Sequence, residues 1–107
     1  MSKHANSYDN EADHHLYEVY DTERDTTFKY GICGDPLNED GSSDRANEQA
    51  DFFNRIVGYF RYFAKVLLEG ISGRRKARQI EDDYIETYRQ KHGKLPEGNL
   101  KHKKYRG

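Results

Sequence analysis

The segment HHLYEVYDTERDTTFKYGIC, residues 14–33, decides the fold because it contains two strand patterns separated by a polar turn. Residues 14–21 alternate so that Tyr17 and its neighbours face opposite sides, which is typical of a β-strand. Residues 27–33, TFKYGIC, repeat this character after the polar stretch TERDTT. The segment therefore predicts a β-hairpin, in which Gly31 indicates a bulge or the close approach of another group.

The rest of the chain predicts a helix to about residue 57, a third strand over 59–68 and a second helix over about 73–91. Ser43 or Asp44 is suited to cap the first helix, and Gly93 to end the second. The segment YFRYFAKVLL is compatible with a continued helix, but its aromatic and β-branched residues favour a strand. The order β-β-α-β-α predicts an α+β fold, with a small, three-stranded, mainly antiparallel sheet flanked by helices.

Composition limits the size of the core. Only 34% of the 107 residues are hydrophobic and the mean hydropathy is -1.19, but nine Tyr and five Phe can supply a small aromatic core. We expect a flexible polar lead-in over 1–13, a domain over 14–99 and a basic tail over 100–107. The single cysteine, Cys33, excludes an internal disulfide and is expected to be a small buried residue.

The charges divide between the two halves of the chain. Residues 1–51 hold four basic and thirteen acidic residues, a balance of -9, and residues 52–107 hold fourteen basic and six acidic residues, a balance of +8. This asymmetry is compatible with a surface that binds a polyanion, with attraction between the halves, or with a basic partner on the acidic half. No run is long and apolar enough to cross a membrane, and no signal peptide is visible, so an export address would lie on a longer parent polypeptide.

Glu81 stands out within the second predicted helix. It lies four residues after Ala77 and four before Ile85, and so falls on the apolar stripe of the segment KARQIEDDYIETY. The neighbouring acids Asp82 and Asp83 are expected to face solvent. A carboxylate on an inner face must be paired, hydrogen-bonded or bound to a metal, because an isolated buried charge is costly.

The sequence is compatible with three roles for Glu81. It could form a structural salt bridge with Arg45 or Arg74, reach water from the edge of the stripe, or hold a divalent metal at a cleft.

Five positions in order along the chain carry a resemblance to a known family. They are Tyr17 in HLYEVY, Gly31 in FKYGIC, then Arg45, Glu81 and Asn99. This arrangement resembles the GIY-YIG (URI) endonuclease superfamily, and it is most similar to the URI-type toxin domains of bacterial polymorphic toxins. The segments YGICGD, NEDGSSDRA, VLLEGISGRRKA and PEGN also resemble that subgroup.

Two positions depart from the family pattern. His15 stands where the first half-motif has its Gly, and Lys29 stands where the second usually has its Tyr. Lys29 could supply positive charge to a phosphate or be a solvated strand residue, and Tyr30 could take over part of the missing tyrosine's role. His14 and His15 face opposite ways on a strand, so one of them could lie beside Tyr17 and act in proton transfer, but both are expected at the surface. His102 is expected to be exposed in the basic tail.

The resemblance implies a metal-activated phosphodiester hydrolase. Glu81 would bind Mg²⁺ or Mn²⁺, and Tyr17 would deprotonate the attacking water, which requires that Lys29, a nearby cation or the metal partly ionise the phenol. Arg45 would hold the phosphate, and Asn99 would fix the loop or a neighbouring phosphate oxygen. The residues expected to contact the nucleic-acid backbone are Arg61, Arg74, Arg75, Lys76 and Arg78.

The function that the resemblance implies is a DNase toxin, delivered into competing bacteria as a secreted effector and acting in the target-cell cytoplasm. Its expected partners are DNA, with RNA as an open possibility, and a cognate immunity protein. No membrane and no small-molecule cofactor are expected. The alternative is a non-catalytic module on a URI fold that binds nucleic acid or protein.

Overall fold

The computed structural model describes residues 11–102. Its elements follow the predicted order β-β-α-β-α, with one short 3₁₀ helix added, and they are β1 (Asp13–Asp21), β2 (Thr26–Cys33), α1 (Asp44–Val57), β3 (Tyr62–Ser72), α2 (Arg74–His92) and η1 (Glu97–Asn99). The α+β class and the predicted hairpin are confirmed. Residues 1–10 of the expected lead-in and 103–107 of the expected tail lie outside the described residues.

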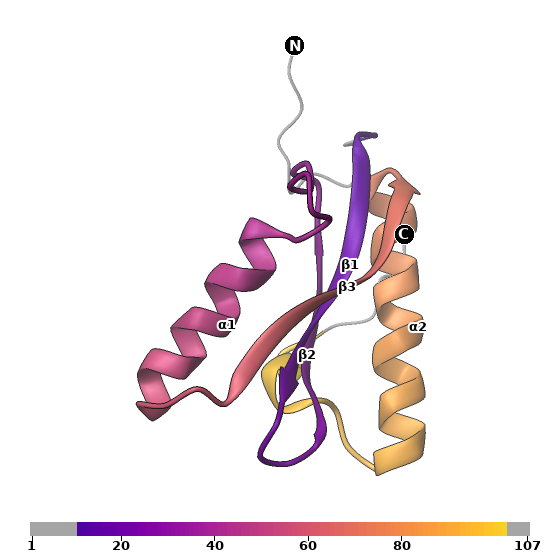
Figure 1. The fold of residues 1–107 in the computed structure, drawn as a ribbon. Coiled ribbons are helices and arrows are strands. Elements are labelled where there is room, and N and C mark those ends of the chain that lie inside the picture. Colours follow the sequence, from indigo (N-terminus) through magenta and orange to yellow (C-terminus); the bar gives the residue numbers. More distant parts are fainter. Residues whose placement is uncertain (1–10, 103–107) are drawn as a thin grey trace.

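One antiparallel sheet with the strand order β2-β1-β3 forms the centre of the fold. The two helices lie on opposite sides of this sheet, as Figure 1 shows. The central strand β1 therefore has a neighbouring strand on each edge and a helix over each face.

Two small hydrophobic clusters fill the two interfaces. The cluster beneath α1 consists of Tyr17, Val19, Cys33, Ala46, Ala50 and Tyr62. The cluster beneath α2 consists of Leu16, Ile32, Ile71 and Ala77. Successive residues of β1 thus enter different clusters, which is why a strand that alternates in sequence is buried on both faces.

Burial on both faces also corrects the prediction for the adjacent histidines. His14 and His15 are only 1% and 3% exposed, so neither is a surface residue. They face opposite ways, as expected, but each meets a covered side of the sheet.

The third strand begins and ends later than predicted. Phe60 precedes it and is 87% exposed. The side chain of Asn54 accepts hydrogen bonds from the backbone N–H groups of Arg61 and Tyr62, at 2.8 and 2.7 Å, and so defines where the turn from α1 ends. At its other end, pairing of Asp13 with Ser72 extends the strand through the segment predicted as a turn.

The predicted first helix is confirmed, and Ser43 is its cap. The Ser43 hydroxyl accepts a hydrogen bond from the N–H of Ala46 at 3.2 Å, and Gly58 ends the helix in the left-handed conformation, with φ of 86°. Such a cap contributes about 1 kcal/mol of stability. The N-terminus of α2, in contrast, has no side-chain cap and no acidic residue in its first turn. Neither helix of the described chain combines the length and apolarity needed to cross a membrane.

Candidate active site

The ring of Tyr17 packs against Gly31, its partner on β2. A β-carbon at position 31 would lie 2.3 Å from Cζ and 2.4 Å from the hydroxyl oxygen of Tyr17, much closer than real side chains approach. The predicted close approach at Gly31 is therefore confirmed. Glycine is required here for the space it leaves, and Tyr17 itself is only 2% exposed.

The surroundings of Tyr17 keep its phenol protonated. Burial raises the pKa of Tyr17 to about 12, against the opposing effect of Arg45, whose charge and hydrogen bond lower it. This shift is opposite to the partial ionisation expected from the sequence, because burial disfavours the phenolate more than Arg45 favours it. Tyr17 is therefore suited to donate a hydrogen bond at neutral pH.

Lys29 and Arg45, the hydrogen-bond partner of Tyr17, line one cleft. The cleft has a volume of about 310 Å³, and its walls also include Glu48, Gln49, Phe52 and Phe53. Lys29 lies two residues before Gly31 on β2, so its side chain leaves the same face of the sheet as Tyr17. Burial lowers the pKa of Lys29, the charge of Arg45 lowers it further, and Glu81 acts in the opposite direction. The cleft thus brings two cations together.

Glu81 is buried on the inner face of α2, as its place on the stripe predicts, and is 7% exposed. Its ion-pair partner is Arg78, one turn earlier on the same helix, in place of the anticipated Arg45 or Arg74. Burial raises the pKa of Glu81, and the charge of Arg78 opposes this shift. The charge of Glu81 also influences the pKa values of Tyr17 and Lys29, so the four residues Tyr17, Lys29, Arg45 and Glu81 form one electrostatic unit with Arg78 at its edge.

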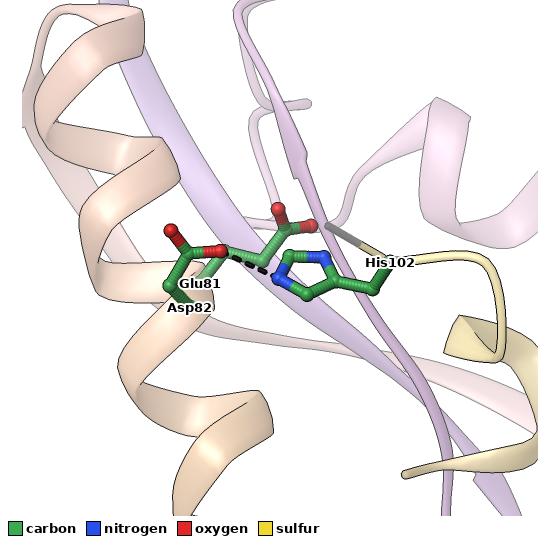
Figure 2. Close-up of side chains that lie close together, drawn as sticks. All are labelled: Glu81, Asp82 and His102. Carbon is green, nitrogen blue, oxygen red and sulfur yellow. Dashed lines mark ion pairs between the residues drawn. The ribbon is translucent and has the colours of Figure 1, made fainter. Parts of the chain in front are cut away.

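Two residues that the sequence did not indicate lie next to Glu81. Asp82 is 5% exposed, and the side chain of His102 is 10% exposed, so both predictions of solvent exposure are wrong. Figure 2 shows the His102 ring, from the C-terminal segment, beside the carboxylates of Glu81 and Asp82 on α2. One ligand atom from each of the three residues lies within 4.8 Å of the others. Carboxylate oxygens and imidazole nitrogen are donors that divalent cations accept, so the set fits the expected metal chemically.

Asn99 has a structural position within this arrangement. Its side-chain oxygen accepts a hydrogen bond from the Tyr30 N–H at 2.8 Å, and its amide donates to the Tyr30 carbonyl at 3.0 Å. The amide group of Asn99 thereby pairs with the edge of β2 as a neighbouring strand would. This contact holds the segment that leads to His102, in agreement with the expectation that Asn99 fixes the loop.

The side chain of Tyr30 is not brought to Tyr17. Tyr30 alternates with Lys29 and Gly31, and its ring packs edge-on against Tyr84 of α2, with centroids 5.6 Å apart. This ring lines a larger cleft of about 540 Å³ between β2 and α2, which contains none of Tyr17, Lys29, Arg45 and Glu81. The size of that cleft does not make it the catalytic centre, because the charged groups converge elsewhere.

The five basic residues expected to contact nucleic acid do not form one surface. Both carboxylate oxygens of Asp21 accept hydrogen bonds from Arg61 at 2.8 Å, and Arg61 also pairs with Glu23 at 2.9 Å. Because these acids occupy its guanidinium, Arg61 is a structural residue at the far end of β1. Arg78 forms ion pairs with Glu81 and Asp82.

The other three predicted basic residues, Arg74, Arg75 and Lys76, form the first turn of α2.

His15 lies on the same face of β1 as Tyr17, with ring centroids 6.2 Å apart. Its Nε2 is 2.8 Å from the Ser43 hydroxyl, the cap of α1. The histidine in the family's glycine position therefore connects β1 to the start of the helix that carries Arg45.

Comparison with known proteins supports the interpretation of the fold. A family model described as "URI fold toxin 2" matches residues 7–93, most of the chain. No curated protein and no solved structure matches the chain significantly. The matched region contains Tyr17, Lys29, Arg45 and Glu81, and ends before Asn99 and His102.

Proposed function

Because the chain belongs to the URI fold toxin 2 family, we propose that this toxin domain is a metal-dependent endonuclease that hydrolyses phosphodiester bonds, with DNA as substrate. Membership supports a nuclease-like toxin, and the chemistry of the cleft supports the finer assignment. We further propose that it is a delivered effector that acts in the cytoplasm of a competing bacterium.

The observation that carries the proposal is the presence of Lys29 and Arg45 in one cleft, with Arg45 hydrogen-bonded to Tyr17. The positive charges of Lys29 and Arg45 repel each other, and an anion bound between them removes this electrostatic cost. Lys29 is half-buried and its pKa is lowered by burial and by Arg45, so it gains more from such an anion than a solvated lysine would. A phosphodiester is an anion that an arginine can bind through two oxygens.

Residues in and near the cleft have different roles in the proposed hydrolysis of a phosphodiester. Arg45 and Lys29 hold the phosphate and stabilise the charge that develops on it. Arg45 donates to the Tyr17 oxygen, and the neutral phenol donates its own proton to a phosphate oxygen or positions the attacking water. A divalent cation at Glu81 would supply Lewis-acid stabilisation and water activation.

Cleavage of supercoiled plasmid, with and without EDTA, tests the proposed function. We expect nicking that requires a divalent cation and that Glu81→Gln abolishes, because glutamine keeps the shape and removes the ligand charge. Asp83→Asn, which neutralises an exposed acid two positions later on the same helix, is the matched control. Circular dichroism melting shows whether each variant is folded. If folded Glu81→Gln cuts as well as the parent, Glu81 is structural and the metal scheme is wrong.

The non-catalytic alternative also has an observation in its favour. Arg78 neutralises Glu81, and burial keeps Tyr17 protonated, so two groups of the expected chemistry are held in inactive forms. A module of this kind would bind DNA through Lys29 and Arg45 without cutting it. Retarded migration of DNA on a gel, with no product under Mg²⁺ or Mn²⁺, would identify this function.

A cognate immunity protein is the partner that a nuclease toxin requires in its producer. We propose that it presents acidic residues to the Lys29–Arg45 cleft and so excludes phosphate. Arg61 does not belong to this interface, since Asp21 and Glu23 already engage it. Hydrogen-exchange mapping of the complex tests this arrangement, and protection confined to residues 11–25 would contradict it.

A further inference from the structure

We propose that Glu81, Asp82 and His102 together form a binding site for a transition-metal dication of the Mn²⁺ type, and that the Arg78 guanidinium competes with the metal for this site. The inference extends the proposed function, with which it shares Glu81. It adds two metal-binding residues and an internal competitor, and it makes predictions about metal binding that do not depend on cleavage.

The first argument is the convergence of three buried donors. Glu81 and Asp82 are adjacent on α2 and both point inward, while His102 reaches them from the segment beyond η1 (Figure 2). His102 Nε2 lies 2.5 Å from an oxygen of Asp82. Two carboxylates in nearly full burial repel each other, and a cation among them removes this cost.

The second argument is the position of Arg78. Its Nη1 pairs with Glu81, lies 3.3 Å from the Asp82 carboxylate and 3.0 Å from Nδ1 of His102. One positively charged nitrogen thus contacts all three donor residues, and it marks the point where a cation is stabilised. A guanidinium neutralises one of the two carboxylate charges, whereas a dication neutralises both.

The position of the His102 ring agrees with this role. Its Nδ1 lies 3.0 Å from Nη1 of Arg78, and its Nε2 faces an oxygen of Asp82. A carboxylate beside the imidazole fixes the orientation of the ring, as is common for histidines that bind metals in proteins.

The donor set also indicates the class of metal. Mg²⁺ prefers oxygen ligands and retains its waters, while imidazole favours first-row transition metals. His102 therefore makes the site selective for Mn²⁺ over Mg²⁺, and a site built on the two carboxylates alone would lack that selectivity.

Binding of Mn²⁺ and of Mg²⁺ to the full chain, measured by calorimetry and by the electron paramagnetic resonance signal of free Mn²⁺, tests the proposal. We expect Mn²⁺ to bind more tightly than Mg²⁺, and His102→Gln to weaken Mn²⁺ binding by about tenfold or more while changing Mg²⁺ little. Asp82→Asn should weaken both metals by about tenfold or more. Arg78→Gln should tighten both, because the competing cation is removed.

Matched controls are available on the same helix. Asp83→Asn and His92→Gln alter exposed residues of the same types, and should leave both affinities unchanged. Mn²⁺ binding that is unaffected by His102→Gln, or weakened by Arg78→Gln, would overturn the proposal and leave the cluster as an ion-pair network. Parallel plasmid cleavage separates this result from the proposed function. Cleavage that survives His102→Gln preserves the nuclease without this site, and the predicted binding pattern without cleavage preserves the site without the nuclease.

Discussion

Gly31→Ala is the substitution whose effect follows most directly from the structure. The new methyl group would lie 2.3, 2.4 and 2.9 Å from Cζ, the hydroxyl oxygen and Cε1 of Tyr17. The ring must therefore move by about 1 Å to restore ordinary contact distances, and it is buried against α1. Overpacking of this kind costs about 1–3 kcal/mol. In a domain of this size, each kcal/mol lowers the melting temperature by about 4–8 °C.

The Tyr17→Ala variant, in which the ring is missing, separates the clash from other effects of the methyl group. Gly31 does not have a positive φ, so alanine is conformationally allowed there. Without a clash, alanine in a strand is more stable than glycine by about 0.5–1 kcal/mol. Gly31→Ala should consequently destabilise the parent and stabilise Tyr17→Ala, in which the ring is missing.

Urea denaturation of the parent, Gly31→Ala, Tyr17→Ala and the double variant measures the effect of Gly31→Ala on the free energy of unfolding with and without the Tyr17 ring. The effect should change sign between the two. Plasmid cleavage by Gly31→Ala should fall together with stability, because the displaced phenol loses its position beside Arg45. Equal destabilisation by Gly31→Ala in both backgrounds would refute the argument, since the cost would then not arise from contact with Tyr17.

Three further predictions concern other parts of the fold and site. Asn99→Leu should accelerate hydrogen exchange of the Tyr30 amide, which loses its acceptor, and lower stability by about 1–3 kcal/mol in urea denaturation. Hydrogen bonds from Arg61 hold the pKa of Asp21 below its usual value, so this contribution to folding is complete above about pH 4 and is lost as the pH falls through the folded pKa. Asp21→Asn should therefore lower stability at neutral pH and flatten its decline on acidification, and an unchanged acid slope would contradict this. Lys29→Ala should reduce cleavage by at least about tenfold, or roughly 1.4 kcal/mol, and an unchanged rate would show that the residue in the family's tyrosine position is idle.

Local patterns were sufficient to predict the fold, because its elements are short and each carries its own signal. The hairpin, the Ser43 cap and the terminating glycines Gly58 and Gly93 all depend on residues close in sequence. The first and last residues of β3 do not depend on nearby residues alone. They depend on the Asn54 side chain and on pairing with β1, which are tertiary contacts that no strand propensity records.

The candidate site also combines features that depend on residues close in sequence with features that depend on tertiary contacts. Glu81 was recognisable because it interrupts an apolar stripe, and its pairing with Arg78 follows a helical spacing of three residues. The sequence pattern places Asp82 in solvent, because the apolar stripe defines only one covered face of the helix. Asp82 is buried because the segment after α2 folds back and places His102 against it, a contact over twenty positions that composition and periodicity do not encode.

The outer edge of β3 has a consequence for the behaviour of the free domain. β3 is an edge strand of eleven residues, and Phe63 and Leu68 on it are 45% and 38% exposed, which are conditions that favour pairing between copies. Two register shifts against β1 bend this strand, and the charged side chains of Lys65 and Glu69 are exposed along it. Bulges and charges are the means by which natural sheets discourage edge-to-edge association. The register shifts against β1 and the exposed charges of β3 therefore also protect the free domain against aggregation.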